Sequence, residues 1–380
     1  MSGGTPTRPT RRAFLAAPAL LASVMAVRGA RADDIVLAGA SVPMTGPGAR
    51  YGAQFKRGFD LALEGIDNLG GAGGRPLQYL LEDTRSDPQR AATAAQAFVA
   101  DPRVVVALDG ASASDLAAAS STLRNAGLAQ IALAASDPAA AGNLAWSLAP
   151  TDAAQGAGLW SFADALGLRR PAVLYPDTGA GRSARDAFAG AAGGSVAGAE
   201  AYVPGQDDFR SALTRLGNAN PDGLVLLSDY ADAALICHQA RDSGSKLPVL
   251  AAAGSSAAEF AVLGGAAAEG VFVLATFFAG SPRPEAQDFV KRYRAKYSAD
   301  ADGSSAVAFD ATVLVSRLVG GWGPTREGVQ KGLAEIKDVP SVVYGRIAFD
   351  PQTHHVQGAA FQRLLVRGGR FIPWDGVKPA

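Results

Sequence analysis

The chain has 380 residues, of which 48% are hydrophobic and 18% charged, so it has ample apolar side chains for a core and is long enough for two domains. Its 35 basic and 35 acidic residues cancel. After residue 32 the chain is mildly acidic and has no cluster of lysine and arginine that would follow a phosphate backbone, which argues against nucleic acid as a partner.

The N-terminal segment has the pattern of an export signal. Arg11 and Arg12 lie in the sequence TRRAFL, which resembles a twin-arginine motif, and an apolar run at 16–27 follows. This run is shorter than the ~20 apolar residues that cross a bilayer, and Ala30-Arg31-Ala32 has the small residues of a cleavage site. We therefore predict that residues 1–32 are a twin-arginine-type signal peptide, cleaved after Ala32, and that the mature protein is periplasmic.

After the signal, short apolar runs alternate with longer alanine-rich stretches of helical period. Phe55, Phe59 and Ile66 repeat on one face of the first such stretch. Asp87 and Pro88 supply an N-cap and a first helical residue for the next one. We predict strands at 35–39, 77–82, 104–108 and 129–133, and helices at 51–69, 88–100 and 115–125.

The same alternation restarts after Pro150. The runs at 104–106 and 224–227 are apolar throughout, as in parallel strands that have helices on both faces. Two such blocks predict the α/β class, with two Rossmann-like lobes around parallel central sheets. In the second block we predict helices at 154–166, 183–192, 208–216, 231–242 and 258–263, and strands at 172–175, 197–203, 224–227, 249–252 and 271–276.

After Thr276 the pattern changes to three helices and a β-rich tail. Gly368 and Gly369 predict a hairpin turn between the last two strands. We predict these helices at 285–297, 304–319 and 326–336, and the strands at 345–349, 360–366 and 371–374.

Few residues could hold a metal or a nucleotide. The only cysteine, Cys237, excludes an internal disulfide and a cysteine-based metal site, and we expect it to be buried in a helix. The 3 histidines are scattered, and Gly46, Gly48 and Gly52 have the wrong spacing for a dinucleotide-binding loop. We therefore expect neither a metal nor a cofactor.

Several segments, in a fixed order, have the sequence pattern of one family. They begin with SVPMTGPG at 41–48 and EDTRSDP at 82–88 and cover nearly all of 33–361. With these segments the chain resembles the branched-chain amino acid (Leu/Ile/Val-type) periplasmic binding proteins of ABC transporters. The other similar segments are AVLY at 172–175, YVPG at 202–205, ANPD at 219–222, AEGV at 268–271, FDA at 309–311 and IAFD at 347–350.

The resemblance implies a type I periplasmic binding fold, in which three crossovers join two lobes. The first lobe would be 33–150 plus 280–345, and the second 151–279 plus 346–380. A ligand would lie in the cleft between the lobes, at the carboxyl ends of the parallel strands, and closure would bury it. The implied protein is a monomer and not an enzyme, and its partners are a small-molecule ligand and an inner-membrane ABC permease.

The resemblance also implies ligand-binding residues at two helix starts and on one wall. Tyr51 would form the wall of the cleft, and Ser112, after Gly110 and Ala111, would hold a ligand carboxylate. Helix starts present unpaired N–H groups that favour an anion, although serine also caps helices without any ligand. Backbone and hydroxyl groups after the 129–133 strand would come from Ala134, Ala135 and Ser136.

Three positions depart from the amino-acid-binding pattern. Ala253 stands where the family has an acid for the ligand ammonium, and Ala180 and Ser304 stand where it has bulky side chains. These changes predict a roomier cleft for a carboxylate-bearing or neutral ligand larger than leucine. Asp229 could supply a displaced negative charge, so a branched-chain or other amino acid remains the alternative ligand.

Two other functions compete with transport. Gly110 to Ser114 resemble a hydrolase nucleophile elbow around Ser112, but the final glycine of that motif is absent. The histidines that such a hydrolase would need are in a predicted helix, at His238, and in a polar turn, at His354 and His355. A ligand-sensing module would have the same two lobes, and the sequence does not separate it from a transport protein.

Overall fold

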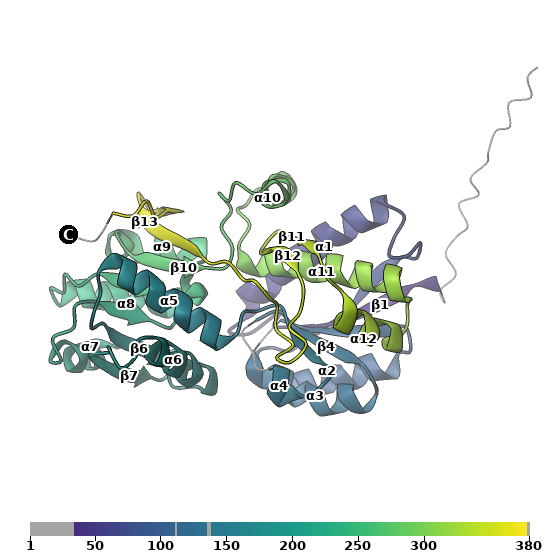
Figure 1. Ribbon diagram of the computed structural model, residues 1–380, viewed down its shortest axis with the longest axis horizontal. Coiled ribbons are helices and arrows are strands. Elements are labelled where there is room, and N and C mark those ends of the chain that lie inside the picture. The colour runs from purple at the N-terminus through teal and green to yellow at the C-terminus, as the bar shows by residue number, and fades with distance from the viewer. Residues whose placement is uncertain (1–33, 111, 135–137, 378–380) are drawn as a thin grey trace, which may run out of the picture.

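The computed structural model describes residues 34–110, 112–134 and 138–377. The predicted signal peptide lies outside these residues. Two halves, each built around one sheet, lie along the long axis of the molecule (Figure 1). The predicted α/β class with two lobes around parallel sheets is confirmed.

The first lobe contains a five-stranded sheet in the order β2-β1-β3-β4-β5, with all neighbours parallel. Strands β1, β3, β4 and β5 are buried because their side chains are mostly apolar on both faces, as the uninterrupted apolar run at 104–106 predicts, whereas the edge strand β2 is mostly half-buried. The strands are β1 (Val36–Val42), β2 (Leu77–Asp83), β3 (Val104–Asp109), β4 (Ala129–Ala132) and β5 (Ala145–Ser147).

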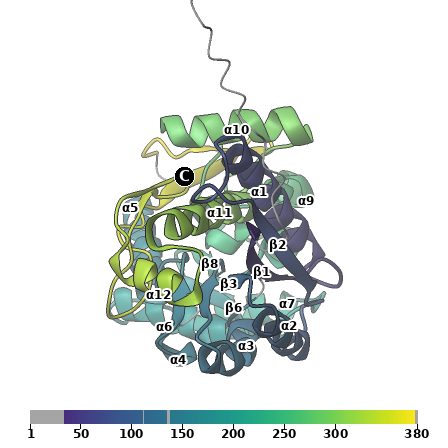
Figure 2. The same ribbon diagram turned by 90° about the vertical axis from the view of Figure 1, so that its right-hand side faces the viewer.

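Helices cover both faces of this sheet (Figure 2). One layer contains α1 (Ala49–Asn68) and α11 (Gly303–Trp322), which pack against each other. The other contains α2 (Pro88–Ala100), whose N-cap Asp87 accepts from the Gln89 N–H as predicted, and α3 (Ala113–Asn125). The lobe also includes α4 (Pro138–Ala141), α10 (Pro284–Tyr297), α12 (Arg326–Glu335), β11 (Val339–Ser341) and β12 (Gly345–Ile347).

The second lobe contains a seven-stranded sheet in the order β14-β13-β10-β9-β8-β6-β7. Strands β6 to β10 are parallel, and the hairpin of β13 and β14 is antiparallel. Gly368 and Gly369 form the predicted turn, with φ of 60° and 70°. The strands are β6 (Ala172–Pro176), β7 (Gly198–Tyr202), β8 (Leu224–Leu226), β9 (Val249–Ala251), β10 (Phe272–Ala275), β13 (Gln362–Arg367) and β14 (Arg370–Pro373).

Two apolar cores fill the space between this sheet and its helices. Cys237 is buried in one of them, on α8 (Tyr230–Asp242). No helix in the described part of the chain has the length and apolar character needed to span a membrane. The helices of the second lobe are α5 (Asp152–Leu166), α6 (Gly179–Ala191), α7 (Arg210–Gly217), α8 (Tyr230–Asp242), α9 (Ala258–Ala268) and the short 3-10 turn η2 (Ala253–Ser255).

The chain passes between the lobes at Pro150, after β10 and again before β13 (Figure 1). The last passage lies later than the predicted boundary at 345/346. Phe349 and Val356 still belong to the core of the first lobe, and His355 forms a bridge with Ser147. The lobe therefore changes between Val356 and the start of β13.

Candidate functional site

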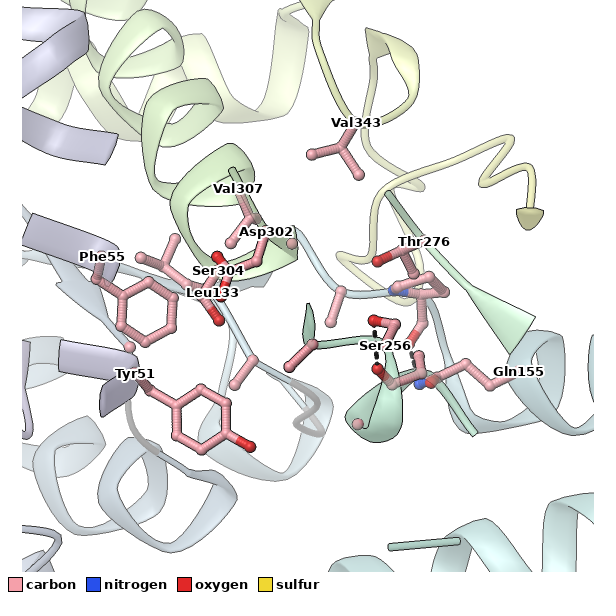
Figure 3. A pocket seen from close by; sticks show the side chains of 18 of the residues that line it. Tyr51, Phe55, Leu133, Gln155, Ser256, Thr276, Asp302, Ser304, Val307 and Val343 are labelled. Carbon is pink, nitrogen blue, oxygen red and sulfur yellow. Dashed lines mark hydrogen bonds between the residues drawn. The ribbon is translucent and has the colours of Figure 1, made fainter. Parts of the chain in front are cut away.

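A cavity of about 300 Å³ lies between the two lobes, at the carboxyl ends of β3, β4, β9 and β10 (Figure 3). This is the edge where open α/β sheets bind ligands. Both lobes contribute to its walls, as do the passages between them at Pro150 and at Thr276. The lining residues are Arg50, Tyr51, Phe55, Gly110, Leu133, Ala134, Ala149, Pro150, Gln155, Ala253, Gly254, Ser256, Ala257, Thr276, Asp302, Gly303, Ser304, Val307, Val343 and Tyr344.

A second cavity of about 360 Å³ adjoins the first one inside the second lobe. The two cavities share Gln155, Ala253 and Gly254. Ala180 and Asp229 also line the second cavity. Empty space therefore lies beside Ala180 and Ala253, the two alanines that were expected to stand in place of larger residues.

Arg50, in the first turn of α1, lies at the centre of the charged groups of the first cavity. Its Nε donates to Oε1 of Glu259 at 2.7 Å and its Nη2 to Oε2 at 2.5 Å. Nη2 also contacts Oδ2 of Asp302 at 3.0 Å. Burial opposes the charge on Arg50, but the hydrogen bonds and charges of Glu259 and Asp302 outweigh it and raise the pKa of Arg50.

Two tyrosines surround this guanidinium. Its Cζ lies 4.6 Å from the ring centre of Tyr230 and 5.5 Å from that of Tyr51, distances at which a cation is attracted to an aromatic face. The two rings meet edge to face at 6.1 Å. Burial, with a smaller effect of the Asp229 charge, raises the pKa of Tyr51, so its hydroxyl is un-ionised at neutral pH.

Three helix starts converge on the first cavity. Thr151 caps α5, and Asp302 caps α11 in a reciprocal pair with Ser305. The start of α9 has no side-chain cap, and Ser256 and Ala257 line the cavity there. The Ser256 hydroxyl instead donates to the carbonyl of Ala253 at 2.7 Å (Figure 3). Because Thr151 and the Asp302 carboxylate already accept from N–H groups of α5 and α11, the uncapped start of α9 is the one of the three that favours a negatively charged group.

The structure brings together only part of the predicted site. Tyr51, Gly110, Ala134, Ala253 and Ser304 line the first cavity, and Ala180 and Asp229 line the second. Ala111, Ala135 and Ser136 lie outside the described residues. The role of each of these residues in ligand binding stays a prediction.

Ser112 has the geometry of an ordinary helix cap. Its Oγ accepts from the Asp115 N–H at 3.2 Å, contacts Oδ1 of Asp115 at 3.0 Å and lies 2.8 Å from Oγ of Ser114. It is not among the residues that line the two cavities. A bound carboxylate at Ser112 would therefore compete with hydrogen bonds that this hydroxyl already makes.

Asp229 also acts as a helix cap. Its Oδ1 accepts from the N–H groups of Ala231 and Asp232, both at 2.9 Å, at the start of α8. The residue is exposed, so a ligand ammonium beside it would remain close to water.

The histidines considered for a hydrolase have structural contacts in the fold. His238 contacts the carbonyl oxygen of Leu263, and His354 stacks on Trp146 with ring centres 4.0 Å apart. His355 is buried and contacts the carbonyl oxygen of Ala149. Within the described chain, none of these histidines forms a hydrogen bond with Ser112.

Arg50 and Asp302, which line the first cavity, and Glu259, which pairs with Arg50, were not predicted from the sequence. Arg50 directly precedes Tyr51, the first residue of the helix predicted at 51–69. This position was the one available signal for a role of Arg50 in the site. Asp302 could have been recognised as the cap of the helix predicted at 304–319. Glu259 had no signal, because its partner is 209 positions away in the other lobe.

Comparisons with known proteins agree with this geometry. A family model described as periplasmic binding protein matches residues 36–368. The Leu/Ile/Val-binding protein homolog 1 of Brucella suis biovar 1 (strain 1330) is 28% identical over 284 residues, which are 72% of this chain and 75% of that protein.

Solved structures have the same two-lobe arrangement. A structure from Rhodospirillum rubrum, assigned to a branched-chain amino acid ABC transporter, is 32% identical with a TM-score of 0.72, and the match covers 90% of this chain and 100% of that one. The substrate-binding protein LivJ of Streptococcus pneumoniae, in complex with isoleucine, is 24% identical with a TM-score of 0.81, over 89% and 97% of the two chains. The likeness to LivJ shows that this chain has the same fold as that protein.

Proposed function

Because the chain belongs to the periplasmic binding protein family, we propose that it is the extracytoplasmic solute-binding component of an ABC importer. The observation that carries this proposal is the cavity formed by both lobes at the carboxyl ends of their parallel strands. Binding and release are its whole task, without catalysis of a reaction. Its relatives include Leu/Ile/Val-binding proteins.

The proposed ligand is a carboxylate-bearing or neutral molecule larger than leucine. Ala253 offers no charge to a ligand ammonium, and burying an ammonium without a partner is costly. The second cavity, beside Ala180 and Ala253, supports a larger ligand than the first cavity alone would hold. The uncapped start of α9 supports an acidic group.

An amino acid is the second candidate ligand. Two carboxylates support it, since Asp302 lines the first cavity and Asp229 the second. The Leu/Ile/Val-binding relatives support it as well.

Calorimetry separates the two ligand classes. Purified protein is titrated with benzoate, leucine, isoleucine and valine, beside native mass spectrometry of whatever co-purifies. We expect benzoate, which is about as large as leucine but has no ammonium, or a larger acid to bind more tightly than the three amino acids. Micromolar leucine binding that collapses in Asp229→Ala would return the protein to the amino-acid-binding group.

We further propose how the protein reaches its ligand and its transporter. A twin-arginine-type signal, residues 1–32, is cleaved after Ala32, and the mature protein acts in the periplasm as a monomer. Its lobes, divided at Pro150, after β10 and before β13, close on the ligand. The closed form then docks on an inner-membrane permease.

A further inference from the structure

Arg50 and Glu259 form an ion pair across the seam between the lobes. Arg50 lies in the first turn of α1 in the first lobe, and Glu259 lies in the first turn of α9 in the second. Both oxygens of Glu259 accept from the guanidinium, in the two-point geometry that makes arginine–carboxylate pairs strong. Among the ion pairs formed within the described residues, this is the one that joins the lobes.

This pair is buried on its arginine side and more open to water on its carboxylate side. The side chain of Arg50 is 18% exposed, that of Asp302 is 10% exposed and that of Glu259 is 42% exposed. Tyr230 from the second lobe packs on the same guanidinium as Tyr51 from the first. Separating the lobes would remove Glu259 and Tyr230 from Arg50 and leave it with Asp302 and Tyr51.

One nitrogen of this guanidinium is unused. Nη1 of Arg50 is buried and has no hydrogen-bond partner within the described chain, although Arg50 lines the cavity. A buried charged donor that lacks an acceptor is unfavourable. Neighbouring atoms cover Nη1, so a carboxylate oxygen of a ligand would reach it after a small movement of these atoms, with Glu259 and Asp302 kept on Nε and Nη2.

We propose that Arg50 couples recognition of an acidic ligand to closure of the lobes. In the closed cleft its Nε and Nη2 hold Glu259 across the seam, and its Nη1 donates to the ligand carboxylate. This inference rests on the proposed function, because it takes the cavity between the lobes as the ligand site. The residue favours acids over their neutral amides and favours the closed form over the open one.

The closure half of the proposal is tested without ligand, by the distance between spin labels on the two lobes. Arg90→Cys and Lys246→Cys place labels on exposed positions of opposite lobes, and buried Cys237 stays unlabelled. We expect the ligand-free protein to populate a short distance, and Glu259→Gln and Arg50→Gln to shift the population to longer distances. The control Lys56→Gln, which removes an exposed pair with Asp60 on the same helix as Arg50, should leave the distribution unchanged.

The ligand half is tested by calorimetry with benzoate and benzamide. Glu259→Gln weakens closure alone, so it should lower the affinity for both probes by the same factor. Arg50→Gln should lower the affinity for benzoate by a further factor of about 10 to 100, the usual range for a hydrogen bond to a charged group, and that for benzamide no more than Glu259→Gln does.

Distinct results overturn distinct claims. Label distances that do not change in Glu259→Gln and Arg50→Gln overturn the closure role of Arg50. Equal losses of benzoate affinity in these two variants overturn its contact with the ligand. If the unmodified protein binds neither probe, the proposed ligand class fails. The label distances alone then decide whether Arg50 stabilises the closed form.

Discussion

Replacing Arg326 with methionine should lower the free energy of unfolding by about 3 kcal/mol. Arg326 is the first residue of α12, and its guanidinium ties together three elements of the first lobe. It lies beside the last turns of α2 and α3 and the first residue of β3. The carbonyl oxygens that accept its hydrogen bonds, at 3.0 to 3.4 Å, belong to Phe98, Val99, Asp101, Val104 and Ala126.

The expected magnitude follows from what these carbonyls lose. Hydrogen bonds from a charged donor contribute about 1.5 to 3 kcal/mol each when buried. A cation at a helix C-terminus adds roughly 0.3 to 1 kcal/mol, and the position of Arg326 at the start of α12 subtracts about as much for one helix. Since Arg326 is half-buried, water can replace some of the five hydrogen bonds when the side chain is removed. The estimate of the lost free energy therefore counts about one full hydrogen bond and the charge effect at the C-terminal ends of two helices, α2 and α3, less that at the start of α12. Methionine keeps the apolar packing of the arginine stem and removes the charge and donors.

Urea unfolding followed by circular dichroism measures the loss. Arg90→Met is the control, because Arg90 is an exposed arginine on α2, and it should change stability by less than ~0.5 kcal/mol. Arg326→Lys has one ammonium group in place of the planar guanidinium. Its loss in free energy of unfolding should lie between those of Arg326→Met and Arg90→Met. A loss below ~1 kcal/mol in Arg326→Met, or an equal loss in Arg90→Met, would refute the assignment of these five bonds as a structural anchor.

Three further predictions concern export, closure and the thiol. N-terminal sequencing of the periplasmic protein should begin at Asp33, and Arg11→Lys with Arg12→Lys should retain the precursor in the cytoplasm; unchanged export of that variant contradicts the twin-arginine route. Small-angle scattering should show compaction when a saturating acid such as benzoate is added, and an unchanged radius of gyration would contradict closure on the ligand. Burial raises the pKa of Cys237 to about 12, so the thiol is un-ionised at pH 8 and a thiol reagent should modify it only in denaturant; rapid labelling of the native protein would show that the site opens.

Much of the fold could be predicted because its signal is local. Helices such as α1 and α2 have apolar residues at helical spacing, and β3 and β8 are continuous apolar runs. The elements that sequence reasoning missed are short: α4, β5 and β11 have three or four residues each. Too few residues are present in such elements to establish a period, and their conformation depends on tertiary neighbours.

The last passage between the lobes was placed too early for the same reason. The 347–356 segment has only scattered apolar residues, and it stays on the first lobe because Phe349 packs on Trp146 and His355 binds the carbonyl of Ala149. Both contacts join residues about 200 positions apart. A sequence pattern contains no information about such pairs unless a relative supplies it.

The residues of the candidate site also differ in whether a local sequence signal could identify them. Gly110, Ala134 and Ala253 could be found, because each follows a predicted parallel strand and such ends meet at one edge of a sheet. The pair of Arg50 and Glu259 could not, because it exists only when two separate lobes face each other. Ser112 was correctly placed at a helix start, while the hydrogen bonds of its hydroxyl depend on Ser114 and Asp115.

The choice between an acidic and an amino-acid ligand depends on which cavity groups are still free to bind. Asp302 already accepts from the Ser305 N–H and from Arg50, and Asp229 accepts from two backbone N–H groups at an exposed position. An ammonium beside exposed Asp229 would gain little, because water screens the pair. A carboxylate beside Nη1 of Arg50 would satisfy a buried charged donor, which is the stronger interaction. Nη1 of Arg50 therefore supports the proposed carboxylate ligand, whereas Asp302, Asp229 and the Leu/Ile/Val-binding relatives support an amino acid.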